Sequence, residues 1–221
     1  MSKCTHKVVL LCGLYLAGAL QAGGMGFLDL IVPEFRTEKA TVPEACEELA
    51  KAGALITLET LPSEKVVRFS LHLRNQTIRA ILDAVVKADQ RYEWREHSSL
   101  AWPYAKIRVI NILPAGAVSD KTNLMNVQIG HADLDNVNVE DVFKSPLDFL
   151  PELRQTYVRK VRFRGVAISE IMPLTPPTQL SRVCVKLHDV TVRDVLNELA
   201  IKSGGIGWKY DGLEHRWNVF R

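Results

Sequence analysis

The chain has 221 residues, of which 47% are hydrophobic and 24% are charged, and its formal net charge at pH 7 is +3. Such a small net charge argues against the clustered basic surface that nucleic-acid-binding domains usually show, so no nucleic-acid partner is expected. The length suffices for one large domain or two small ones.

Residues 1–22 have the composition of a secretory signal peptide. Two lysines make a short basic start, and residues 8–20 form an uncharged apolar run that ends in small residues. A membrane-spanning helix needs about 20 apolar residues, so this run is too short for an anchor. We expect cleavage after Ala19 or Ala22 and export of the mature chain. Cleavage removes two lysines and no acidic residue, which lowers the net charge from +3 to +1.

Residues 33–113 are predicted to form a first small module. Residues 35–41 resemble a strand, and a proline-led helix begins at Val42 and ends at Gly53. Residues 54–61 are predicted to form a second strand.

A strand and a capped helix follow. Phe69, Leu71 and Leu73 alternate with polar residues, as in a half-buried strand. From Ile78 onward the aliphatic residues recur with helical spacing, and Thr77 stands where its hydroxyl can cap that helix.

A hairpin of two strands, over residues 92–97 and 106–112, completes the module. The element order is β-α-β-β-α-β-β. Helices packed on small mixed sheets belong to the α+β class, which is the fold class predicted for the whole chain.

Residues 114–124 contain proline and glycine and few large apolar side chains, and are predicted to be a linker. Residues 125–221 are predicted to form a second, partly degenerate module. Within it we expect a first strand over residues 127–129 and a short helix over 139–143, followed by strand material over 157–168. The prolines at 173, 176 and 177 indicate a loop, and a closing strand is expected over 215–220.

The two modules are related by an internal repeat at an offset of 114 residues. Each copy has an alternating strand, a threonine-capped helix and a strand that carries a tryptophan. Six residues are identical over 27 positions: Arg68/Arg182, Leu73/Leu187, Thr77/Thr191, Arg79/Arg193, Leu82/Leu196 and Trp94/Trp208. The matching positions of Trp94 and Trp208 favour a shared role in the core.

The stretches VPEACEELAKAGALITL and KVVRFSLHLRNQTIRAILDAVVKADQRYEWR resemble the secretin and TonB short N-terminal domain, and VCVKLHDVTVRDVLNELAIKSGGIGWKY is similar to the latter half of that domain. The resemblance implies a periplasmic domain that docks to other envelope proteins and contributes no catalytic, metal-binding or cofactor-binding residues. Because the chain ends at Arg221, we expect a free-standing adaptor, without a following barrel or secretin core. No transmembrane segment is expected in the mature chain.

Two cysteines, Cys46 and Cys184, lie in the mature part. An export compartment permits a disulfide between them. Cys46 lies on the apolar face of its predicted helix, whereas Cys184 lies on the opposite face of its strand from Val183 and Val185. This placement favours a buried free thiol at Cys46 over a Cys46–Cys184 bridge.

Residues 133–141 are rich in oxygen donors, as a calcium loop would be. An EF-hand-type loop has glycine at its sixth position and glutamate at its twelfth, where this chain has Asn138 and Lys144. Capping of a short helix is therefore the preferred interpretation.

The five mature histidines, His72, His97, His131, His188 and His215, show no close ligand spacing and are predicted to lie on polar surfaces. No nucleophile-elbow motif is present. Residues 204–207 fit the G-x-x-G loop of a KH module, but they follow a helix and precede a strand, so a helix stop is preferred.

Residues 154–164 form the densest basic run, in which Val161 and Phe163 alternate with cations. The run is interpreted as a solvated strand face. A contact with anionic lipid or an acidic partner is the alternative.

The leading hypothesis is thus a non-enzymatic periplasmic adaptor that offers strand edges or helix faces to an envelope protein. A second hypothesis is a small-ligand or envelope-glycan binding protein with a cleft between the modules. A hydrolase is the third, and the sequence proposes no nucleophile for it.

Overall fold

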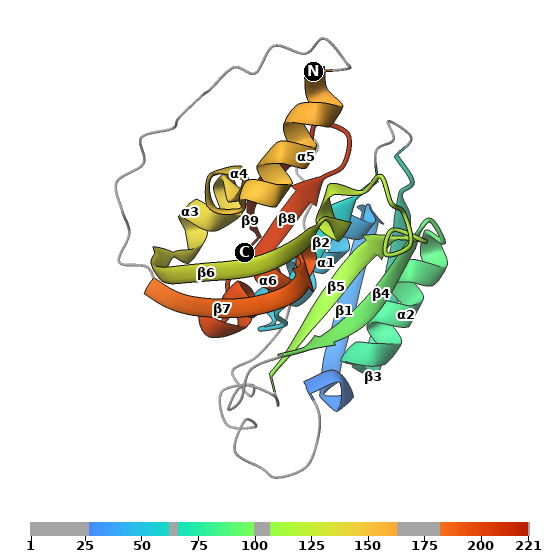
Figure 1. Ribbon diagram of the computed structural model, residues 1–221. Helices are drawn as coiled ribbons and strands as arrows, with labels where there is room; N and C mark the ends of the chain where they lie inside the picture. Colours follow the sequence, from blue (N-terminus) through green and yellow to red (C-terminus); the bar gives the residue numbers. More distant parts are fainter. Residues whose placement is uncertain (1–26, 62–65, 100–106, 163–181, 221) are drawn as a thin grey trace, which may run out of the picture.

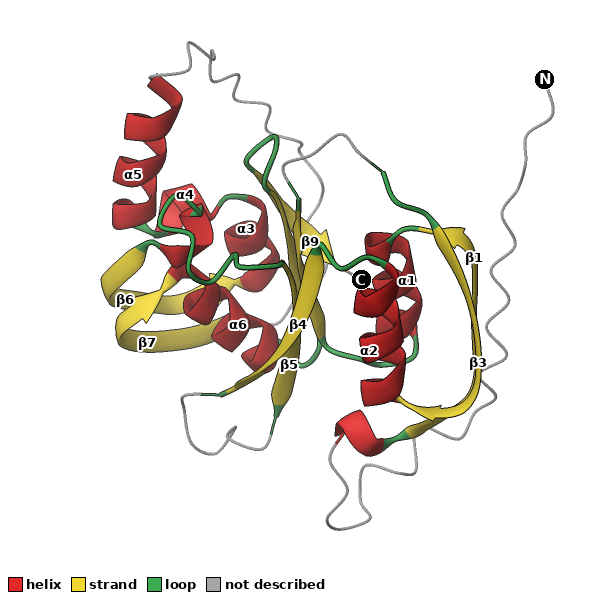
Figure 2. Ribbon diagram, turned by 90° about the vertical axis from the view of Figure 1, so that its right-hand side faces the viewer, coloured by secondary structure: helices red, strands yellow, loops and turns green. Residues whose placement is uncertain are grey.

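The computed structural model describes residues 27–61, 66–99, 107–162 and 182–220. Figure 2 shows five layers: a two-stranded ribbon, a pair of helices, a central sheet, further helices and a second ribbon. The helices on both sides contribute apolar side chains to a core that lies between a ribbon and the sheet.

The first half supplies one ribbon and one helical layer. Its core gathers large aliphatic side chains from both helices and from the sheet, with Phe35 of the ribbon fully enclosed. The elements are the 3-10 helix η2 (Phe27–Asp29), the antiparallel pair β1 (Ile31–Ala40) and β3 (Phe69–Thr77), and the helices α1 (Val42–Lys51) and α2 (Ile78–Ala88).

The second half repeats this arrangement on the other side of the sheet (Figure 1). A separate core lies there, with Trp208 fully buried in it. The elements are η4 (Leu124–Asn126), the antiparallel pair β6 (Gln128–Asn138) and β7 (Arg182–Thr191), and the helices α3 (Val139–Lys144), α4 (Pro146–Phe149), α5 (Pro151–Arg162) and α6 (Val192–Lys202).

The central sheet contains strands of both halves in the order β4-β5-β2-β8-β9. β2 pairs in parallel with β5 on one side and with β8 on the other, and the outer pairs are antiparallel. The strands are β2 (Ile56–Thr60), β4 (Tyr92–Ser98), β5 (Arg108–Pro114), β8 (Gly207–Asp211) and β9 (Arg216–Phe220). The predicted α+β class is confirmed, and the structure adds that the two halves share one mixed sheet.

The repeat extends upstream of the sequence match. The backbone N–H of Ile78 donates to Leu30 O at 3.1 Å, and that of Val192 donates to Val127 O at 3.1 Å. Both ribbons have a register irregularity, between Thr37 and Ala40 in one and between Leu134 and Val137 in the other. These upstream counterparts are 97 positions apart, whereas the downstream ones are 114 apart, so the second half has 17 additional residues between α3 and β7.

The basic run proves to be helical, which corrects the strand expected over residues 157–168. Its described part belongs to α5, which begins at Pro151 with Glu152 in the first turn, where both residues favour a helix. Leu153 is fully buried, and Tyr157, one turn later, packs against the same core. The helical spacing of these two residues outweighs the short alternation near the end of the run. Residues 163–168 and the expected proline loop lie outside the described residues.

No helix in the described ranges is long and apolar enough to cross a membrane. The predicted signal peptide also lies outside these ranges, so its assignment stays a prediction.

Matched capping threonines allow a test of the repeat. Thr77 Oγ1 accepts from Ala80 N at 3.2 Å, and Thr191 Oγ1 accepts from Asp194 N at 3.2 Å. We expect Thr77→Ala and Thr191→Ala each to lower the free energy of unfolding by about 1 kcal/mol in urea denaturation. Serine at either position keeps the hydroxyl and should preserve stability. A serine variant as unstable as its alanine counterpart would contradict this role.

Candidate functional site

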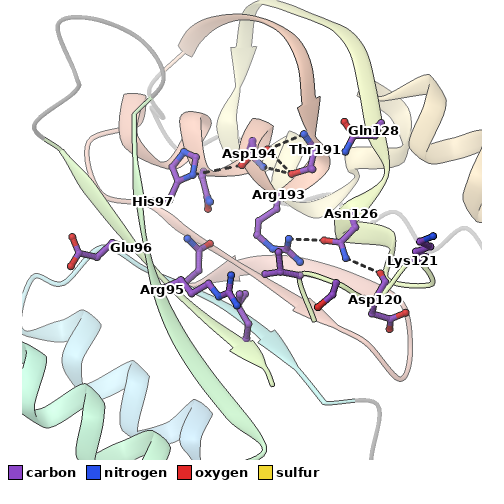
Figure 3. Close-up of a pocket in the computed structure, with 15 residues that line it drawn as sticks. Arg95, Glu96, His97, Asp120, Lys121, Asn126, Gln128, Thr191, Arg193 and Asp194 are labelled. Atoms are coloured by element: carbon purple, nitrogen blue, oxygen red, sulfur yellow. Dashed lines mark hydrogen bonds and ion pairs between the residues drawn. The ribbon is translucent and has the colours of Figure 1, made fainter. Parts of the chain in front are cut away.

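An open cleft of about 580 Å³ lies between the two halves, on the side of the sheet that faces α6. Figure 3 shows its walls: β4 and β5 on one side, and the start of α6 on the other. Residues 118–121 of the predicted linker form part of its rim. Neither half alone would contain this cleft.

Successive side chains of a strand in the central sheet point to opposite faces of the sheet, and each face has its own core. A polar residue on the face toward the second core can therefore line the cleft. On β5, Ile110 and Ile112 belong to the first core, whereas Val109 belongs to the second. Asn111 points the same way as Val109 and lines the cleft. Its Oδ1 accepts a hydrogen bond from Thr57 Oγ1 on β2 at 2.8 Å, so this part of the wall is buried but hydrogen-bonded.

A buried ion pair joins the halves beneath the cleft. Arg193 on α6 donates through Nε to Glu59 Oε1 on β2 at 2.5 Å, and both side chains are more than nine-tenths buried. Arg193 Nη1 also donates to Asn126 Oδ1 at 2.7 Å, and Asn123 Nδ2 donates to Glu59 at 2.9 Å. Such a pair requires these additional hydrogen bonds, because removing two charges from water is costly.

His97 connects β4 to α6 at the other end of the cleft. Its Nδ1 lies 3.6 Å from Asp194 Oδ1, and its Nε2 lies 3.6 Å from Glu198 Oε1. The Glu198 carboxylate also accepts from Ser99 Oγ at 2.9 Å. Only 13% of the His97 side chain is exposed. His97 therefore faces polar side chains, as a polar-face residue would, but it is largely buried and does not lie on the open surface.

Three buried nitrogen atoms at this cleft lack a hydrogen-bond partner among the described residues. They are His97 Nε2, Arg193 Nη2 and Asn197 Nδ2. The arginine and amide nitrogens can only donate, and the imidazole nitrogen donates in one of its tautomers. Asn197 is held in place because its Oδ1 accepts from the Trp208 indole Nε1 at 3.1 Å. All three atoms are buried, so an acceptor could reach them only if the surrounding side chains moved, and His97 Nε2 already faces the Glu198 carboxylate at 3.6 Å.

The corresponding contact in the first half is exposed. Trp94 Nε1 donates to Asp83 Oδ1 at 2.8 Å, and the Arg79 guanidinium lies over the Trp94 ring, 5.4 Å from its centroid. The core role expected for the tryptophan pair is confirmed at Trp208, while Trp94 is only partly buried. The repeated residues thus have different environments, and only the second set borders the cleft.

Sequence reasoning did not identify Glu59 or Arg193 as a pair. One signal was present, because Glu59 is the one charged residue in the strand ALITLETL, whose other residues are aliphatic side chains and two threonines. Its partner is 134 positions away, and no local pattern connects the two.

The other predicted sites lie elsewhere. Asn138 Oδ1 accepts from Glu140 N at 3.1 Å and caps α3, which confirms helix capping for residues 133–141. Among the described residues, no group of three or more potential ligands could hold a metal ion. The described cations of the basic run lie on α5 and do not line the cleft, although Lys160 Nζ donates to Thr122 O, beside the rim residues Asp120 and Lys121.

The glycine-rich loop ends α6 as predicted. Gly204 and Gly205 have φ values of 80° and 129°, which side chains rarely tolerate. Gly207 has a further role that the sequence did not indicate. A Cβ atom there would lie 2.1 Å from Ile56 O, so β8 can approach β2 only if this residue is glycine.

Both Cys46 and Cys184 are free thiols, the first buried and the second exposed. Burial, with a smaller effect of Glu47, raises the pKa of the Cys46 thiol well above its usual range. Cys184 Sγ lies 2.9 Å from Asp135 Oδ1 on the surface of the ribbon. The preference for a buried free thiol at Cys46 is confirmed.

Differential alkylation should separate these two thiols. We expect iodoacetamide to label Cys184 in the folded protein, and Cys46 only after urea is added, because a buried thiol is both inaccessible and protonated. Peptide mass spectrometry would locate the label. Equal labelling of both cysteines in the folded protein would contradict this expectation.

Together, the shared sheet and the interfacial cleft define an α+β protein whose two related halves form one polar site. Comparison with protein-family models gives no match, and comparisons with curated proteins and with solved structures give none either.

Proposed function

We propose that this protein is a non-enzymatic adaptor of the bacterial periplasm that binds extended segments of envelope proteins by strand addition. The resemblance of residues 33–113 to secretin and TonB short N-terminal domains supports this proposal, as does the signal-peptide composition of residues 1–22. The function would lie in transport, secretion or signalling across the envelope.

The observation that carries the proposal is the pair of outer ribbons. Within the described ranges, β1 pairs only with β3, and β6 pairs only with β7. Each ribbon packs through one face on its helices (Figure 2), and the outer edge of each of its strands has no strand partner among the described residues. An extended peptide can add to such an edge through backbone hydrogen bonds.

The outer faces of the ribbons are charged, which disfavours uncontrolled pairing between copies. On the first ribbon, Glu34 lies 2.8 Å from His72 Nε2 and 4.0 Å from Arg74. On the second, Lys186 lies 3.3 Å from Asp133. A partner would therefore be recognised through hydrogen bonds to its backbone and through its polar side chains, and not through an apolar patch on the ribbon.

Site-specific photo-crosslinking in the producing cells tests this proposal. A photoreactive residue at Arg36 or Arg74, both exposed on the first ribbon, should give a discrete adduct with one envelope protein. Leu213, exposed at the turn between β8 and β9, is the matched control. Mass spectrometry should place the crosslink in an extended segment of the partner. Adducts of equal yield from Leu213, or none from the ribbon, would count against strand addition.

The cleft favours a second candidate, the binding of a small acceptor-rich ligand such as an envelope-glycan fragment. The polar lining of the cleft, which includes Arg95, His97 and Asn197, supports it. Saturation-transfer NMR with an N-acetylated disaccharide of peptidoglycan should show contacts that His97→Ala removes and His72→Ala retains. Signals that persist in the His97 variant would exclude this cleft as the site.

A further inference from the structure

Two histidines that are far apart in the sequence face each other on the second ribbon. His131 on β6 and His188 on β7 are directly opposite in register, and their Nδ1 atoms are 3.1 Å apart. Their ring centroids are 4.5 Å apart, with an angle of 39° between the ring planes. Because 57 positions separate them, their spacing gave no sign of a site.

The separation of the two nitrogens suits a metal ion. Two imidazole nitrogens, each about 2.0–2.1 Å from one ion, lie about 3.3–3.4 Å apart at a tetrahedral angle. At the right angle of a tetragonal site they lie about 2.9 Å apart. The observed separation of 3.1 Å lies between these values. We propose that His131 and His188 chelate a divalent transition-metal ion, of the class Zn²⁺, Ni²⁺ or Cu²⁺, through their Nδ1 atoms.

The ribbon holds both ligands in position before any ion binds. Opposite residues on antiparallel strands have Cβ atoms about 4.5–5.5 Å apart, so neither histidine depends on a loop for its placement. Ala132, next to His131, is buried in the second core, and Leu187, next to His188, packs against the same core, which anchors the ribbon at this point. Because the fold already fixes the backbone positions of both histidines, little backbone entropy is lost when an ion binds.

The surroundings also favour the required tautomer of one ligand. Asp133 Oδ2 lies 3.9 Å from Nε2 of His131, the ring nitrogen that does not face His188. This separation is longer than a hydrogen bond, and the same oxygen also pairs with Lys186 at 3.3 Å. A negative charge on that side still favours the tautomer with its proton on Nε2, which leaves the Nδ1 lone pair for an ion. More than half of the His131 side chain is exposed, so water can fill the remaining coordination positions.

Nitrogen donors determine the class of ion. Imidazole suits zinc, copper and nickel, whereas magnesium and calcium prefer oxygen ligands. One Nδ1–H can donate to the other Nδ1, which accounts for the short contact between the rings. For both Nδ1 lone pairs to face an ion, the proton of the donor ring must move from Nδ1 to Nε2. Because the ion and protons compete for these lone pairs, affinity should fall at acidic pH.

Isothermal titration calorimetry of the full chain with NiCl₂, ZnCl₂ and CuCl₂, after removal of metal with EDTA, tests the proposal. We expect one site that either His131→Ala or His188→Gln weakens by at least about tenfold, because each variant removes one of two ligands held together. His72→Ala is the matched control, since His72 faces Glu34 on the other ribbon and should leave the affinity unchanged. Circular dichroism would verify that each variant is folded.

Two results would overturn the proposal. One is the absence of binding by all three ions at neutral pH. The other is binding whose affinity is the same in the His131 and His188 variants as in the unsubstituted chain, which would place the ion at another site. Loss of binding in the His72 variant as well would count equally against it.

Discussion

Replacing Arg193 by alanine is expected to lower the free energy of unfolding by about 3–5 kcal/mol, because the change leaves a buried carboxylate without its countercharge. Glu59 is 1% exposed and would retain only the hydrogen bond from Asn123. Urea denaturation followed by tryptophan fluorescence would measure the effect, since Trp208 lies in the adjoining core.

The repeat provides a matched control for this prediction. Arg79 is the counterpart of Arg193 in the first half, but it pairs with Glu96 on the surface and is 46% exposed. Arg79→Ala should therefore cost no more than about 1 kcal/mol. Replacing Glu59 by leucine together with Arg193 by methionine should recover much of the lost stability, because it removes both charges. If the Arg79 and Arg193 variants lost equal free energy of unfolding, burial would not determine how much each ion pair contributes to stability.

Gly207→Ala is expected to lower the free energy of unfolding by about 3 kcal/mol or more, which is at or above the upper end of the effects of overpacking a core. The added methyl group would lie 2.1 Å from Ile56 O and 3.4 Å from Phe220 O. The first contact is far too short, and both atoms belong to backbone within the sheet, so neither can rotate away. The strands β2 and β8 must separate to accommodate it, and faster amide hydrogen exchange in β8 would report that separation.

Gly130→Ala is the control for the glycine substitution. Gly130 lies on β6, its φ is not positive, and a Cβ there would meet nothing within 4 Å. The free energy of unfolding of the Gly130→Ala variant should stay within about 0.5 kcal/mol of that of the unsubstituted chain. If Gly207→Ala were equally neutral, the close approach of β8 to β2 would not be required for folding.

The parts of the fold that sequence predicted are those determined by neighbouring residues. Alternation at Phe69, Leu71 and Leu73 indicated β3, and the change to helical spacing after Thr77 indicated α2. Each of these signals arises within about ten residues, where the period of apolar side chains distinguishes strand from helix. Glycine and proline positions likewise indicated where α1 begins and α6 ends.

The features that sequence did not predict depend on which distant segments become neighbours. Nothing in the strand around Ile56 indicates that it will lie between β5 and β8, because an apolar strand can pair on either side. The same limit applies to Glu59 with Arg193 and to His131 with His188, which meet across 134 and 57 positions. α5 was missed for a different reason, because a short alternation of Val161 with charged residues resembled a strand.

The position of β2 inside the shared sheet has a consequence for dividing the chain. If the chain were cut within residues 114–124, the two fragments would remain paired through β2 and β8, as in a split protein that reassembles from its pieces. Produced alone, the first fragment would expose one edge of β2, next to the fully buried Ile56 and Leu58. Such an edge is prone to aggregation. We therefore expect each half to need the other in order to fold, although the two halves share a repeated architecture.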